Sequence, residues 1–237
     1  MPNFVYYIPV ATTLFSIYFA WHIFRRYNTK GGGMHLLWWG AGVVMYGVGT
    51  FTESYVSIFG WNEFIFRSWY IAGALLGGAP LAQGTVYLLL KPKTANRLTW
   101  ALIPAIIIAA FFVLITPLDY SQVEPFRLSG GVIHWQWVRL FSPFINLYAF
   151  VFLVGGAILS AVRFKRNNKT YYRFIGNVLI AFGALLPGIG GTFTRFGYIE
   201  ILYITEFLGL SLIFAGYLFN INNKKLIDLR DKKIILS

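Results

Sequence analysis

The stretch Leu98–Thr116, LTWALIPAIIIAAFFVLIT, decides the fold, because it runs for 19 residues without a charged side chain. A helix needs about 20 mostly apolar residues to cross the hydrocarbon core of a bilayer. Six further stretches along the chain meet the same requirement: Phe4–Phe24, Leu36–Phe59, Ile65–Leu90, Leu140–Val162, Phe174–Phe193 and Ile201–Phe219. The sequence therefore predicts an all-α polytopic membrane protein with seven transmembrane helices.

The composition excludes a soluble globule and polar disorder. Of the 237 residues, 57% are hydrophobic and only 12% are charged, whereas about 25% of the residues in soluble domains are charged. The chain has no cysteine, which excludes disulfides and thiolate chemistry. We expect one membrane domain over residues 1–219, followed by a basic cytoplasmic tail over residues 220–237.

Basic residues gather in alternate connections and set the orientation. The first, third and fifth connections and the tail hold 16 of the 20 Lys and Arg residues. The other four fall on the opposite side: Arg67, Arg127, Arg139 and Arg195. Because cytoplasmic loops are enriched in Lys and Arg, the N-terminus is expected outside the cell and the C-terminus in the cytoplasm. The net charge of +12 thus indicates a multi-pass protein of the plasma or inner membrane and no nucleic-acid partner.

Two segments outside the helices carry their own expectations. The 23-residue connection Pro117–Arg139 contains Trp135 and Trp137 and is expected to form an ordered lid at the outer membrane interface. In the tail, apolar and basic residues alternate in a pattern that suits anchoring to the inner leaflet. Contact with a partner helix is the alternative for the tail.

Four charged residues fall at similar depth on four different predicted helices: Glu53, Arg67, Arg195 and Glu206. An ionisable side chain inside the membrane is costly and marks a candidate functional site. Glu53 shares a helical stripe with small or polar residues, as does Glu206: Gly42, Tyr46, Gly49 and Thr50 for the former, Gly209 and Gly216 for the latter. Small residues let helices approach closely, so both acids are expected to face protein.

Our hypothesis is that these four charges build a ligand-binding pocket that opens outward. Aromatic residues would form its rim: Trp61, Trp69, Tyr70, Trp135 and Trp137. Gln83 of the third predicted helix is expected near the middle of the membrane, where its amide needs a partner, and it joins the candidate ligand-binding residues. The alternative is that the charges form two buried ion pairs that fix helix packing, with the tryptophans in an interfacial belt.

Two glycine- and proline-containing runs allow two interpretations. Pro80 follows Gly77-Gly78 in the third predicted helix and favours a kink, because proline removes a backbone hydrogen bond. The related run Gly183–Gly191 contains Pro187 in the sixth. These glycines suit close helix packing, or alternatively a broken-helix binding site of the kind found in transporters.

No residue pattern supports an enzyme or a cofactor. All lysines lie in the predicted cytoplasmic connections or the tail, so a retinal Schiff base is excluded. The three histidines, His22, His35 and His134, fall on both sides of the membrane and do not form a metal cluster. Nucleotide-binding loops and serine triads are also absent from the sequence.

The second half of the chain resembles the seven-helix N-terminal sensor region of some prokaryotic histidine kinases. The similarity covers Trp69–Phe219 and rests on the helix that ends in Ile115-Thr116-Pro117, the tryptophan-containing outer loop, and Tyr172-Arg173-Phe174-Ile175-Gly176 leading into Gly183-Ala-Leu-Leu-Pro187. The resemblance implies a sensor that reads a stimulus near the outer face. The residues after the last predicted helix contain no phosphoacceptor histidine or ATP-binding domain, so if the chain signals, we expect it to act through a separate protein.

The sequence leaves three functions open. The first is a non-enzymatic sensory or accessory module that binds a small or lipid-like ligand in an outward-facing pocket and acts on a protein partner at the cytoplasmic face. The second is a small-solute or proton-coupled transporter in which Glu53 or Glu206 titrates. The third is a structural subunit of a membrane complex.

Overall fold

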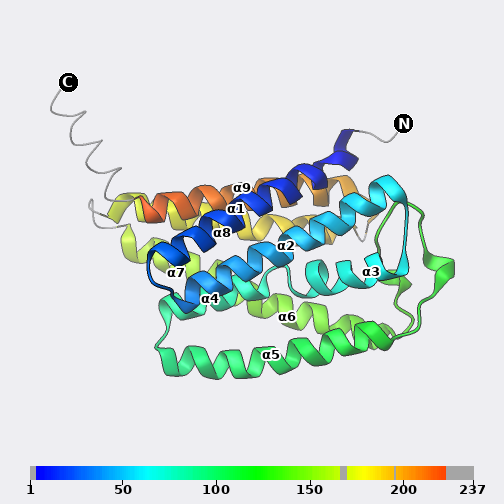
Figure 1. Ribbon diagram of the computed structural model, residues 1–237, viewed down its shortest axis with the longest axis horizontal. Coiled ribbons are helices and arrows are strands. Elements are labelled where there is room, and N and C mark those ends of the chain that lie inside the picture. Colours follow the sequence, from blue (N-terminus) through cyan, green and yellow to red (C-terminus); the bar gives the residue numbers. More distant parts are fainter. Residues whose placement is uncertain (1–3, 166–169, 195, 223–237) are drawn as a thin grey trace.

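The computed structural model describes residues 4–165, 170–194 and 196–222, and these residues form an elongated bundle of helices (Figure 1). Within these ranges the only extended pairings are two isolated bridges, Leu118–Ile133 and Glu124–Arg127. The predicted all-α fold is therefore confirmed. Arg195 and the tail beyond Asn222 lie outside the described residues.

Nine α-helices make up the bundle: α1 (Ile8–Thr29), α2 (Met34–Phe59), α3 (Glu63–Trp69), α4 (Ala79–Leu89), α5 (Pro92–Ile115), α6 (Phe141–Ala149), α7 (Gly155–Phe164), α8 (Tyr171–Thr194) and α9 (Ile199–Ile221), counted over the described ranges. A π-helical turn, Tyr70–Leu75, follows α3, and a second one, Phe150–Val154, joins α6 to α7.

Six helical segments in the described part of the chain are long and apolar enough to cross a membrane: Phe4–Thr29, Glu63–Leu89, Pro92–Ile115, Gln136–Phe164, Tyr171–Thr194 and Ile199–Ile221. These segments define a multi-pass helical membrane protein. The remaining long helix, α2, has 26 residues. It packs against α1, α3 and α4 and buries glycine, threonine, serine and glutamate residues.

The connections between the helices lie at the two ends of the bundle (Figure 1), and these ends differ in their charged residues. At the basic end, Arg25 and Arg26 lie near the end of α1, Lys30 lies in the α1–α2 connection, and Lys91 lies between α4 and α5. At the opposite end, called the loop end here, lie the α2–α3, α5–α6 and α8–α9 connections. Helix α5 lies at the edge of the bundle (Figure 1) and exposes most of its apolar side chains.

The two proline-containing runs behave differently. The predicted helix Ile65–Leu90 is broken between Leu75 and Ala79, and Pro80 lies in the first turn of α4, where its missing N–H costs nothing. The predicted kink is thus confirmed. Pro187, in contrast, lies inside the continuous helix α8. The glycines of α8 pack against α9, since a Cβ on Gly183 would lie only 2.6 Å from the carbonyl oxygen of Gly209.

The α5–α6 connection is ordered, as predicted. It folds into short 3₁₀ turns and buries four apolar side chains: Leu128, Val132, Ile133 and Val138. This apolar cluster continues into Phe66 and Tyr70 of the α3 segment and Val113 of α5. The connection therefore closes the loop end of the bundle over α3 and α5.

Candidate functional site: a buried carboxyl pair

Glu53 of α2 and Glu206 of α9 lie next to each other, close enough for their carboxyl groups to form a hydrogen bond. Both point into the protein, as their helical stripes predict, and only 3% of Glu53 is exposed. The structure thus brings together two of the four charged residues that the sequence indicated.

Aromatic side chains donate hydrogen bonds to the carboxyl group of Glu53 and to the backbone of Glu206. The indole Nε1 of Trp69 donates a 3.1 Å hydrogen bond to Oε1 of Glu53. The hydroxyl of Tyr46, two turns before Glu53 on α2, donates a 3.0 Å hydrogen bond to the backbone carbonyl of Glu206. Oε2 of each glutamate is buried and has no hydrogen-bond partner in the described structure. The pair therefore retains free acceptor capacity.

The pair has no cationic partner among the described residues. The guanidinium of Arg67 turns to Glu63 at 2.8 Å and donates to the backbone carbonyls of Val113 and Thr116 at 2.5 and 3.0 Å. Arg67 therefore links α3 to the end of α5 and is not part of the carboxyl pair. Arg195 is outside the described residues, so its predicted place in the site stays a prediction.

The side chains on either side of the pair are different in character. Toward the loop end, Tyr203 is buried one turn before Glu206 and contacts the ring of Tyr6 edge-on. Toward the basic end, three fully buried apolar side chains belong to one cluster with Tyr46: Val43, Leu210 and Ile213. The carboxyl pair thus lies above an apolar layer that separates it from the basic end.

Gln83 belongs to a separate and well-satisfied network. Its Nε2 donates to the backbone carbonyl of Ala95 and to Oγ1 of Thr99, at 3.2 and 2.7 Å. Its Oε1 accepts a hydrogen bond from the hydroxyl of Tyr148. Gln83 is fully buried, and these bonds join α4 to α5 and α6, so it has a clear packing role.

The predicted aromatic rim is dispersed. Tyr70 is buried beneath Gly130 of the loop, and Trp61 contacts Phe66 and Tyr120. Trp135 and Trp137 stack on each other with ring centroids 6.1 Å apart. Trp69 is the rim residue that reaches the carboxyl pair by a hydrogen bond in the described structure. Tyr46, which the sequence placed only on the stripe of Glu53, is a second member of the site.

Hydrogen bonds to Glu63 also tie the loop to α3. The hydroxyl of Tyr120 donates a 2.6 Å hydrogen bond to Oε2 of Glu63, and this bond raises the pKa of Tyr120. Nearby, hydrogen bonds from the hydroxyl and backbone N–H of Ser121 lower the pKa of Asp119. These contacts lie at the solvent-exposed edge of the loop and are structural.

The fold and site define a polytopic α-helical membrane protein with a buried pair of carboxyl groups. The chain matches no family model, and comparisons with curated proteins and with solved structures found no similar protein. The functional assignment therefore rests on the residues of this chain and their geometry.

Proposed function

We propose that this chain is a seven-helix sensory or accessory module of the cell membrane, and that its responsive element is a proton held between Glu53 and Glu206. The observation that carries this proposal is the contact between two buried carboxyl groups without a cationic partner in the described residues. The basic connections favour a topology with the N-terminus outside, which places the pair in the outer half of the membrane.

Two adjacent carboxyl groups in apolar surroundings cannot both be ionised without strong repulsion. A proton shared by Glu53 and Glu206 therefore holds α2 against α9, and its loss favours their separation. Such a proton shifts a conformational equilibrium when it binds the two states with different affinity. The other titratable side chains that face the pair are tyrosines: Tyr46 of α2, Tyr203 of α9 and, farther away, Tyr6.

The change would be read at the cytoplasmic end by a separate protein. Helices α1 and α9 pack against each other and both run to the basic end (Figure 1), so a movement of α9 is transmitted there. The resemblance of Trp69–Phe219 to kinase sensor regions supports this assignment. A small or lipid-like ligand that reaches the pair from the outside would act on the same equilibrium.

A proton-coupled transporter is the second candidate, because transporters also use intramembrane carboxyl groups as proton carriers. The free Oε2 atoms of Glu53 and Glu206 suit this role. The apolar layer argues against transport, because a transport path would have to pass through it. This layer is formed by Val43, Leu210 and Ile213. Proton flux into liposomes that contain the purified protein would favour the transporter. Liposomes that stay impermeable to protons would favour the sensor.

Infrared difference spectroscopy across a pH titration tests the responsive element. The intact protein is expected to show the carbonyl band of a protonated carboxylic acid at neutral pH, and the band should disappear at alkaline pH. The double variant E53Q/E206Q should lose this band. The matched control Glu124→Gln changes an exposed loop carboxyl group and should keep it. A neutral-pH spectrum without the band, or a band that survives the double substitution, would refute the proposal.

Native mass spectrometry of the protein in mild detergent tests the proposed partner. A second protein that is retained by the wild type and released by E53Q/E206Q would support a module whose carboxyl pair controls a partner. Retention that is the same in both proteins would favour a structural subunit instead.

A further inference from the structure

A cavity lies at the basic end of the bundle, away from the carboxyl pair. It measures about 210 Å³ and is lined by six residues of α1 and α9: His22, Arg25, Arg26, Thr29, Tyr217 and Ile221. A water molecule needs roughly 10–15 Å³ of such space, so the cavity has room for a tetrahedral oxyanion with its hydration.

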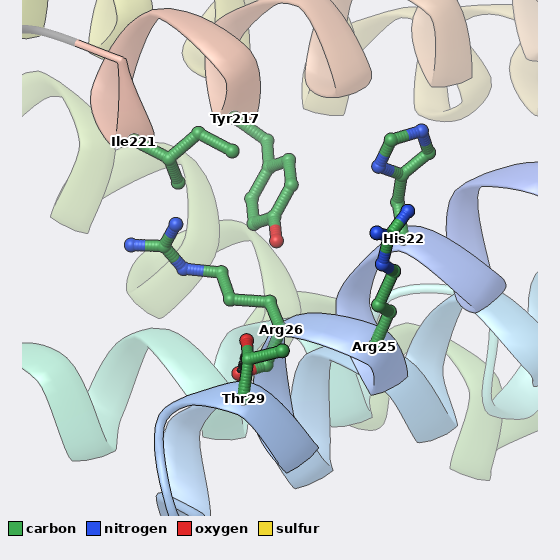
Figure 2. A pocket seen from close by; sticks show the side chains of 6 residues that line it. All are labelled: His22, Arg25, Arg26, Thr29, Tyr217 and Ile221. Atoms are coloured by element: carbon green, nitrogen blue, oxygen red, sulfur yellow. Dashed lines mark hydrogen bonds between the residues drawn. The ribbon is translucent and has the colours of Figure 1, made fainter.

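In the part of the chain that the structure describes, no acidic side chain neutralises the arginines of this cavity. Within the described residues, neither Arg25 nor Arg26 forms an ion pair with an acidic side chain. The guanidinium of Arg25 lies 5.3 Å from the ring centre of Trp21, which orients it. Figure 2 shows the Arg26 side chain extending beneath Tyr217 toward Ile221. Two guanidinium groups that are free to donate make the cavity strongly attractive to an oxyanion.

The hydroxyl of Tyr217 is an independent indication of a ligand. Only 6% of Tyr217 is exposed, and its hydroxyl is buried without a hydrogen-bond partner in the described structure. Buried hydroxyl groups are normally hydrogen-bonded. In Figure 2 this hydroxyl points into the cavity toward Arg26, where it can donate to a bound oxygen atom.

The depth of the cavity fits a membrane headgroup. Both α1 and α9 belong to segments that are apolar enough to span a membrane, and these segments end at Thr29 and Ile221, which are also lining residues. The cavity therefore lies where two spans end together. Ile221 and the Tyr217 ring give it an apolar wall, while the arginines face the anion.

We infer that this cavity binds the phosphate group of an anion, with Arg26 and Tyr217 as direct ligands and Arg25 as a supporting charge. The phosphate comes either from an anionic lipid headgroup or from free phosphate in the cytoplasm. This site is independent of the carboxyl pair, and its test does not rest on the function proposed above.

Thermal melting of the detergent-solubilised full chain tests the site, because a ligand that binds only the folded state raises the melting temperature. Phosphatidylglycerol and inorganic phosphate are titrated separately. We expect at least one to stabilise the wild type, and R26Q and Y217F to bind it at least tenfold more weakly. Stabilisation by phosphatidylglycerol alone identifies a lipid headgroup, and stabilisation by inorganic phosphate alone identifies free phosphate.

Two features keep the test specific. Y217F removes only an unpartnered hydroxyl, so it should fold and melt like the wild type without ligand. Lys30→Gln removes one exposed charge beside the cavity and should leave binding unchanged. The inference is overturned if neither probe stabilises the wild type, if R26Q and Y217F bind as tightly as the wild type, or if Lys30→Gln weakens binding as much as R26Q does.

Discussion

Trp69 on α3 donates a 3.1 Å hydrogen bond to Glu53 on α2, and the same carboxyl group adjoins Glu206 on α9. The consecutive helices α2 and α3 thus meet the distant helix α9 at one buried acid. The indole satisfies one oxygen of Glu53 without adding a positive charge. It therefore holds the carboxyl group in place but leaves the repulsion between the two acids for a proton to relieve.

Trp69→Phe is expected to destabilise the protein, because it keeps the ring but removes the hydrogen-bond donor. Leaving a buried acceptor without its partner costs about 1–3 kcal/mol, which would lower the melting temperature. Trp100→Phe is the matched control, since Trp100 on α5 is 78% exposed and should tolerate the change. Equal melting temperatures for the two variants would contradict the role of the indole.

Alkaline pH is expected to weaken the wild type, because ionisation of both Glu53 and Glu206 would place two negative charges side by side. E206Q leaves a single carboxyl group and should flatten this alkaline decline in melting temperature. Glu124→Gln should keep the wild-type profile, since Glu124 pairs with Arg127 on the surface. Profiles for E206Q and the wild type that remain parallel would show that the pair does not control stability.

Helical periodicity was sufficient to predict that Glu53 and Glu206 face the protein, because a stripe of small residues marks a packed helix surface. It was not sufficient to predict their partners. The sequence grouped Arg67 with these acids by depth alone, whereas its guanidinium reaches Glu63 and the end of α5. Depth follows from the position of a residue within a span, but the identity of its neighbour depends on which helices pack together.

The hydrogen-bond partners of Gln83 and Trp69 could not be predicted from the sequence either. The need of a buried amide for partners could be predicted, but Tyr148 lies 65 positions away and is brought close only by the packing of α6 on α4. Trp69 was expected at the rim of a pocket as an aromatic residue. Its hydrogen bond to Glu53 depends on the placement of α3 beside α2, which the local sequence does not encode.

Close contact of α8 with α9 is expected to make Gly183 intolerant of a side chain. In Gly183→Ala, the Cβ would lie 2.6 Å from the carbonyl oxygen of Gly209, so the helices must move apart at a cost of about 1–3 kcal/mol. Gly188 is on the same helix with open space around its Cβ position. Gly188→Ala should therefore leave the melting temperature unchanged or raise it, because alanine favours a helix over glycine.

Arg67 is expected to be essential for the loop end of the bundle. Its side chain is only 16% exposed, and Arg67→Gln would remove hydrogen bonds to two backbone carbonyls of the α5 end. Hydrogen bonds from charged groups contribute about 1.5–3 kcal/mol, so hydrogen exchange should accelerate across residues 113–140. Arg139→Gln, which loses one exposed contact to Gln136, should show little change. Unaltered exchange in Arg67→Gln would argue against this anchoring role.

Gln83→Leu distinguishes a packing role from a ligand-binding role. The substitution keeps a similar volume but leaves the Tyr148 hydroxyl without its acceptor and removes both donors to α5. We expect a loss of about 1–3 kcal/mol in stability and an unchanged infrared band from the carboxyl pair. Gln122→Leu in the exposed loop controls for the chemical change. A different result would contradict the packing role: Gln83→Leu would melt like the wild type but alter the infrared band of the carboxyl pair. Gln83 would then belong to the functional site, and the apolar layer beneath Glu53 would not isolate the carboxyl pair.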